Sequence, residues 1–204
     1  MIMKKYLLMS TVLLFSLSMN SQQTGFKAAK WEKEYDNVDA CTCGLAKVEK
    51  NGKHGFVTEE GKLVVPLIYD EALAFSEGKA AVMIGNKWGY IDSTGKELLK
   101  LQFTDASSFS EGMAKVTLNE KCGFVDETGK LVIDIQYNNA SHFKEGLAAV
   151  SNAKARWGYI DKTGAIVIPF AYSFAMEFAD SKAQVMKEGK WSSIDKKGNA
   201  MKDE

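Results

Sequence analysis

The three cysteines and two histidines are the side chains of this 204-residue chain best suited to bind a metal ion. Cys41 and Cys43 are separated by one residue, whereas zinc-binding pairs are separated by two to four and come with a second pair. His54 and His142 are far apart in the sequence. We therefore predict no metal site and no cofactor. Cys122 either pairs with one of the other two cysteines, as an oxidising compartment would favour, or packs as a small hydrophobic residue.

Two sets of acidic residues recur at a nearly constant spacing, and carboxylates are the groups that calcium sites and glycosidases use. One set comprises Asp92, Asp126, Asp161 and Asp195, and the other comprises Glu77, Glu111, Glu145 and Asp180. Calcium takes six to eight oxygen ligands, whereas each of these positions supplies one carboxylate. A glycosidase needs two carboxyl groups in unlike environments, whereas repeated positions offer like ones. We predict that both sets lie in turns and that no residue is catalytic.

Aromatic side chains are the strongest candidates for contact with a ligand or partner. The candidates are Trp88, Trp157 and Trp191, together with Tyr90 and Tyr159, which follow the first two tryptophans by two residues. Such rings can stack on sugars or anchor a protein partner. They can equally form the core between repeated units, and their apolar neighbours favour that interpretation. The sequence leaves both roles open.

These residues occupy fixed positions in a repeat that is read five times, with a period of 34 or 35 residues. One glycine recurs as Gly61, Gly95, Gly129, Gly164 and Gly198. Phe-Ser-Glu-Gly occurs at 75–78 and at 109–112, and Phe-Lys-Glu-Gly at 143–146. Residues 31–201 hold five periods, with a half unit at each end. A fixed period over this much of a chain indicates a repeat architecture.

Each unit is predicted to fold into a small β-meander. In the first unit, residues 45–48 and 54–58 are β-prone, and Asn51-Gly52 between them is a strong hairpin signal. An Asp-x-Thr-Gly turn follows the second strand in later units. A third strand is expected over 63–66, ended by its proline because proline removes a ladder donor. Residues 69–77 form a turn or a turn with a fourth short strand.

Two arrangements of the units are compatible with the repeat. The whole number of periods and the half units at both ends favour a closed five-bladed β-propeller. The period of 34 residues favours an open array, because propeller blades usually need about 40–50 residues. We predict an all-β fold in which tandem 34-residue β-meander repeats form an open array, with the closed propeller as the alternative.

Two segments carry a resemblance to a known family. Lys-Trp-Gly-Tyr-Ile-Asp at 87–92 and Arg-Trp-Gly-Tyr-Ile-Asp at 156–161, each followed by Thr-Gly, resemble the WG-repeat family of bacterial proteins. The resemblance covers roughly residues 31–201. It implies β-rich tandem repeats, commonly in exported proteins, and it supplies no catalytic residue. His54 and Cys122 stand at the tryptophan position in two units, and Ser192 replaces the glycine in the last unit.

The first 21 residues have the layout of a secretory signal peptide. Lys4 and Lys5 precede an apolar run over 7–17, and small residues follow it. That run is too short to span a bilayer. We predict a signal peptide over 1–21, a linker over 22–30 and five WG-type repeats over 31–204. The mature chain would have no membrane span and would be periplasmic, on the cell surface or extracellular.

The charge balance narrows the function. Twenty-six basic residues face 26 acidic ones, so the chain lacks the basic footprint of a nucleic-acid-binding protein. Identical repeated positions also disfavour catalysis, because active sites usually break symmetry. We predict an exported, non-catalytic binding or scaffold protein whose repeat surface contacts a protein or a cell-envelope polymer. The alternative is a lectin-like repeat protein that binds carbohydrate.

Overall fold

The computed structural model describes residues 30–201, which form five four-stranded antiparallel sheets and one short 3-10 helix, η1 (Lys30–Glu34). The first sheet comprises β1 (Asn37–Val38), β2 (Leu45–Lys50), β3 (Lys53–Thr58) and β4 (Leu63–Tyr69). The second comprises β5 (Glu71–Ala72), β6 (Lys79–Ile84), β7 (Lys87–Asp92) and β8 (Glu97–Phe103). The third comprises β9 (Asp105–Ala106), β10 (Met113–Leu118), β11 (Lys121–Asp126) and β12 (Leu131–Tyr137). The fourth comprises β13 (Asn139–Ala140), β14 (Leu147–Ser151), β15 (Trp157–Asp161) and β16 (Ile166–Tyr172). The fifth comprises β17 (Phe174–Ala175), β18 (Ala183–Lys187), β19 (Lys190–Ile194) and β20 (Ala200–Met201).

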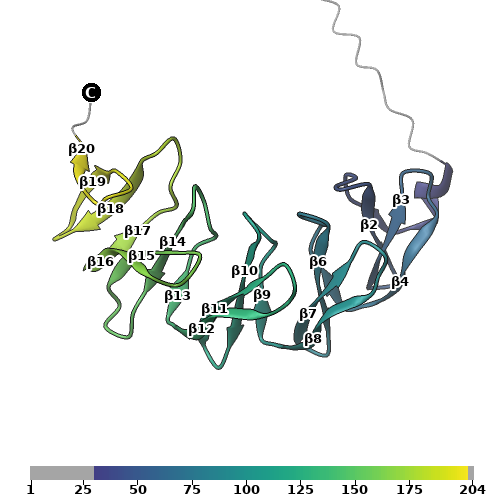
Figure 1. Cartoon of the computed structure of the whole chain (residues 1–204). Coiled ribbons are helices and arrows are strands. Elements are labelled where there is room, and N and C mark those ends of the chain that lie inside the picture. Colours follow the sequence, from purple (N-terminus) through teal and green to yellow (C-terminus); the bar gives the residue numbers. More distant parts are fainter. Residues whose placement is uncertain (1–29, 202–204) are drawn as a thin grey trace, which may run out of the picture.

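The five sheets stand side by side in a curved row that does not close (Figure 1). In each sheet the spatial order of the strands follows the chain. This confirms the predicted all-β open array, and the closed five-bladed alternative does not form. Within residues 30–201, no helix is long and apolar enough to cross a membrane.

Local turn chemistry shapes each meander as the sequence predicts. Asn51 and Gly52 both have positive φ, 54° and 70°, as a two-residue hairpin of this kind requires. In the second sheet, the Oδ1 atom of Asp92 accepts hydrogen bonds from the Thr94 N–H (2.9 Å), the Thr94 hydroxyl (2.6 Å) and the Lys96 N–H (3.0 Å). These contacts, the Thr94 hydroxyl first, hold the pKa of Asp92 below its usual range. The aspartates of this set are turn residues.

The strand predicted over 63–66 is longer than expected. β4 runs through Pro66 to Tyr69, so the expectation that proline ends the strand is wrong. β4 is an edge strand, where the missing N–H removes no ladder bond. The undecided stretch 69–77 contains a fourth short strand, β5, which belongs to the following sheet. The last segment of each repeat therefore pairs in the sheet of the following repeat.

The glycine of the Trp-Gly pair is required by a close approach of two strands. A Cβ atom at Gly123 would lie 2.4 Å from the carbonyl oxygen of Ile133 in β12. The pairing of β11 with β12 shifts register at this point. In the last unit Ser192 takes the position. Sterics therefore explain the repeated glycine of the inner units.

Aromatic pairs fill the space between neighbouring sheets. Each pair joins a ring on the third strand of one sheet to a phenylalanine after the first strand of the next, with ring centroids 4.6–5.1 Å apart and steep interplanar angles. The pairs are Phe56–Phe75, Tyr90–Phe109, Phe124–Phe143 and Tyr159–Phe178. Edge-to-face packing of this kind adds about 0.5–1.5 kcal/mol to the burial of each ring. The sheets are therefore held to one another by the same contact four times.

A ladder of carboxylates links the turns that carry the second acidic set. The Glu77 carboxylate accepts hydrogen bonds from the N–H groups of Glu111 (2.7 Å) and Gly112 (2.8 Å). Glu111 does the same for Glu145 (2.5 Å) and Gly146 (2.9 Å). The prediction that these residues lie in turns is confirmed, and the structure adds that the three glutamates each accept a hydrogen bond from the backbone of the next turn.

The N-terminal end of the row is covered by the half unit. Trp31 stands 34 residues before Val65, and its indole lies against Gly61 and leaves no room there for a Cβ atom. In the next unit the side chain of Val65 meets Gly95 in the same way. Trp31 therefore replaces the missing preceding sheet.

The C-terminal end of the row carries polar side chains instead. Inner repeats place an alanine or a lysine stem and an aromatic ring toward the next sheet, as Ala149 and Tyr159 do in the fourth sheet. The fifth sheet has Gln184 and Ser193 at these positions, and the Gln184 Nε2 donates to the Ser193 Oγ (2.8 Å). A terminal repeat with a polar outer face is typical of open repeat arrays.

Candidate functional site

The two candidate tyrosines lie inside the protein. The side chains of Tyr90 and Tyr159 are 1% and 0% exposed. Their hydroxyl groups donate to the carbonyl oxygens of Ser107 (2.7 Å) and Met176 (2.8 Å) in the following repeat. Burial raises the pKa of both hydroxyl groups. Both tyrosines join repeats to one another, and their rings are out of reach of a ligand.

The three candidate tryptophans occupy different environments. Trp88 packs against the core between the second and third sheets, and Trp157 against the core between the fourth and fifth. Trp191, in β19, is 50% exposed. The structure brings Trp157 and Trp191 to either side of Phe174, with ring centroids 5.5 Å and 5.8 Å from it. Trp88 lies in another unit, so the tryptophans do not form one continuous row.

A hollow of about 540 Å³ opens between the fourth and fifth sheets, and Trp157 lines it. We call this hollow the Trp157 groove. Its lining consists of Asn139, Ala140, Ser141, Trp157, Phe174, Ala175, Met176 and Glu177. Most of the surface inside it is apolar. Concave, mostly apolar surfaces with a few polar groups are the usual form of a binding site.

The Trp157 groove is the place where the surface departs from the repeat. In the three preceding units, the position of Phe174 holds Glu71, Asp105 and Asn139, the position of Met176 holds Leu73, Ser107 and Ser141, and the position of Glu177 holds Ala74, Ser108 and His142. Phe174 and Met176 are 42% and 50% exposed. Large apolar side chains gathered on a surface mark interaction sites. Here polar residues of the repeat have been replaced by such side chains.

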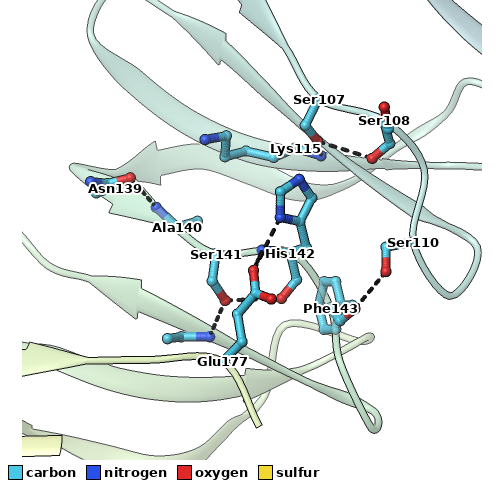
Figure 2. Close-up of polar contacts among 11 residues, drawn as sticks. Ser107, Ser108, Ser110, Lys115, Asn139, Ala140, Ser141, His142, Phe143 and Glu177 are labelled. Atoms are coloured by element: carbon cyan, nitrogen blue, oxygen red, sulfur yellow. Dashed lines mark hydrogen bonds and ion pairs between the residues drawn. The ribbon is translucent and has the colours of Figure 1, made fainter. Parts of the chain in front are cut away.

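One lining residue of the groove, Glu177, carries a carboxylate, which Figure 2 shows against His142. The Oε1 atom of Glu177 accepts a hydrogen bond from the His142 N–H (3.0 Å) and lies 3.0 Å from the His142 Nδ1. The neighbouring Ser141 hydroxyl donates to the His142 carbonyl (2.9 Å) and accepts from the Ala149 N–H (2.9 Å). These contacts bind the loop after β17 to the loop after β13. The position of the Glu177 carboxylate is therefore set by the fourth sheet.

The sequence prediction missed Phe174, Met176, Glu177 and His142 as site residues. The signal was present in the repeat alignment, because the Phe174 position is polar in the three preceding units and the Met176 position is polar in two of them. Which changed residues share a groove depends on how two sheets face each other. That arrangement is not contained in the sequence of a single unit.

The remaining candidate residues do not form a site. Cys122 is buried at the tryptophan position, where it packs as a small hydrophobic residue, while Cys41 and Cys43 are exposed. All three carry free thiols in the described structure. The His54 Nε2 lies 3.7 Å from the Glu71 carboxylate. Between residues 30 and 201 there is no cluster of three or more metal-ligating side chains.

The fold and the groove define a tandem β-repeat protein with one specialised inter-repeat surface. The family described as "WG containing repeat" matches residues 32–53, 55–88, 88–122, 123–153 and 157–191, and the chain belongs to this family. No curated protein matches the chain.

Two solved structures illustrate what the chain is similar to. Hsv2 from Kluyveromyces lactis is 11% identical, with a TM-score of 0.51, and the match covers 78% of this chain and 59% of that chain. The WD40 β-propeller domain of Doa1 is 10% identical, with a TM-score of 0.43, and the match covers 82% of this chain and 67% of that domain. The chain thus spans about 59% of the length of Hsv2. The likeness to Hsv2 concerns the fold alone.

Proposed function

We propose that the protein is an exported, non-catalytic binding scaffold that holds a protein partner in the Trp157 groove. The observation that carries this proposal is the local loss of repeat character at Phe174 and Met176. Both side chains are large, apolar and half exposed, although polar residues fill most of the equivalent positions. Leaving them in water has no benefit for folding, so a partner that covers them accounts for their presence.

The surroundings of the groove support a binding role. Trp157 and Phe174 present adjacent rings, and Trp and other aromatic residues dominate the energetics of protein interfaces. Tyr159 fixes the backbone of Met176 through the 2.8 Å hydrogen bond to its carbonyl oxygen. A surface that is ordered before binding loses less entropy when the partner arrives. The proposed export rests on the leader-like residues 1–21, which lie outside the described residues.

The proposal is tested by capture of partners with a variant that restores the repeat. Phe174→Asn combined with Met176→Ser introduces the residues that the fourth sheet carries at the same positions, Asn139 and Ser141. This double variant should keep the fold and its melting temperature within a few degrees. We expect a partner cross-linked to the wild-type protein in cells to be lost from the double variant.

A matched control is available in the second unit. Trp88→Phe changes the tryptophan of a groove that has Asp105, Ser107 and Ser108 at the positions of Phe174, Met176 and Glu177, and partner capture should be unchanged. Partners captured equally by the wild-type protein and the double variant would contradict the proposal. A glycan array probed with both proteins tests the carbohydrate alternative, which predicts hits that the double variant loses.

A further inference from the structure

We propose that the Trp157 groove recognises a lysine side chain of its partner. This inference rests on the proposed function and specifies the chemistry of the same site. Among the eight residues that line the groove, Glu177 is the one ionisable side chain. Its Oε1 atom is paired with His142, which is not a lining residue. A purely apolar partner segment would desolvate the other carboxylate oxygen without giving it a partner. A cationic partner group supplies one.

The hydrogen bonds of Glu177 select the kind of cation. Its Oε1 is occupied on one side by the His142 N–H and on the other by the His142 ring. Its Oε2 accepts no hydrogen bond from residues 30–201 and is the oxygen left for a ligand. An arginine fork binds a carboxylate best through both oxygens. A lysine ammonium is a compact point charge that a single oxygen can receive end-on.

The wall of the groove suits the rest of a lysine side chain. The rings of Trp157 and Phe174 and the thioether of Met176 form its apolar surface. The four methylene groups of lysine can lie along such a surface while the ammonium group reaches a polar rim. An ammonium beside tryptophan and phenylalanine rings is also attracted by their π faces. The apolar stem of a partner lysine therefore fits the wall of the groove, while its ammonium group reaches the Glu177 carboxylate.

The occupant is an extended segment of another protein. The Phe174–Ala175 strand, β17, is the outer strand of the fifth sheet and is two residues long, so little of the sheet shields the groove on that side. In the preceding groove, between the third and fourth sheets, the equivalent positions hold Cys122, Asn139 and His142 and offer neither the aromatic wall nor the carboxylate. The inference therefore assigns the lysine to the Trp157 groove and not to the groove that precedes it.

The test uses the full-length protein labelled with ¹⁵N and two short peptides. Acetyl-Gly-Val-Lys-Val-Gly-amide is titrated while the indole N–H signal of Trp157 is followed by NMR, and the Trp157→Phe variant identifies that signal. The second peptide carries norleucine, which keeps the apolar stem and lacks the charge. We expect the lysine peptide to shift the Trp157 signal and to bind at least about tenfold more tightly than the norleucine peptide.

Matched variants separate the lysine inference from the scaffold proposal. Glu177→Gln should reduce the affinity for the lysine peptide by about tenfold, whereas Glu97→Gln, on an exposed strand of another sheet, should leave it unchanged. Equal binding of both peptides, tighter binding of an arginine peptide, or an unmoved Trp157 signal would overturn the inference. A cellular partner that is lost from the Phe174→Asn, Met176→Ser variant but kept by Glu177→Gln would overturn the lysine assignment alone. A partner kept by both would overturn the scaffold proposal.

Discussion

The carboxylate of Glu111 accepts a hydrogen bond from the backbone N–H of Gly146, 35 residues further along the chain (2.9 Å). Burial alone would raise the pKa of Glu111, but the N–H groups of Gly146 and Glu145 and the ammonium of Lys162 together hold it below its usual range. A charged acceptor thus satisfies the strained turn of the next repeat. The ladder of glutamates joins neighbouring sheets at their loops, while the aromatic pairs join them in the core.

Removal of one carboxylate of this ladder should lower the stability of the whole repeat array. We expect Glu111→Ala to lower the free energy of unfolding by about 1–2 kcal/mol, because two charge-assisted hydrogen bonds are lost while the freed N–H groups regain water. Urea denaturation followed by tryptophan fluorescence measures the change. Glu97→Ala, at an exposed strand position, should stay within about 0.5 kcal/mol of the wild-type protein. Equal stability of the two variants would show that the ladder contributes nothing.

The first turn has no glutamate at the position of Glu77, and we predict that introducing one there stabilises the protein. Cys43 stands at the glutamate position of the first turn and has φ of 53°, close to the 52° of Glu77. Cys43→Glu should therefore adopt the same backbone conformation and place a carboxylate beside the N–H groups of Glu77 and Gly78. We expect a gain of about 1 kcal/mol. Cys43→Ser is the control, since it removes the thiol without reaching those N–H groups, and a gain of the same size in both variants would contradict the explanation.

The turn aspartates predict how stability depends on pH. The Thr128 hydroxyl and neighbouring N–H groups hold the pKa of Asp126 below its usual value of 3.8. A group with a lowered folded pKa contributes stability that is complete above the unfolded value and is lost as the pH falls through the folded value. We therefore expect the melting temperature to fall on acidification below about pH 4. Asp126→Asn should weaken this dependence, and an unchanged acid slope in the variant would argue against the role of Asp126.

The glycine of the Trp-Gly pair gives a steric prediction with an internal control. Gly123→Ala places a Cβ atom against the Ile133 carbonyl, so the two strands must move apart. We expect a loss of about 2–3 kcal/mol, as for other overpacked positions. Ser192→Ala, at the same position of the last unit, should cost less than about 1 kcal/mol, because Ser192 already carries a Cβ atom and the change adds none. Thermal unfolding of both variants compares their stabilities directly. Similar losses of stability would show that the close approach of the two strands is not the cause.

Most of the fold could be predicted from the residues that recur at fixed positions of the repeat, because hairpin, turn and strand signals are found in each unit. The Asn51-Gly52 hairpin and the Asp92 turn have the chemistry expected of them. The role of Glu77 could not be predicted, since its partners lie one repeat away and no local pattern points to them. The strand through Pro66 was missed because an edge position is a property of the sheet.

The candidate site was predicted in part. Trp157 was singled out for its residue type, and the structure places it in the groove. Tyr90 and Tyr159 were grouped with the tryptophans because residues two apart on a strand point to the same face. How deeply each ring on that face is covered depends on the packing of the sheets, which buries both tyrosines completely. Phe174 and Met176 are site candidates because their side chains are exposed, and the sequence does not show which apolar residues are exposed.

The most direct test of the scaffold proposal is site-specific photo-cross-linking in cells. A benzoylphenylalanine at position 176 lies in the Trp157 groove, and the same residue at position 107 occupies the equivalent place in the third unit. The proposal predicts a discrete protein adduct from position 176 that is absent from position 107. No adduct from position 176, or the same adducts from both positions, would contradict a binding role for the groove.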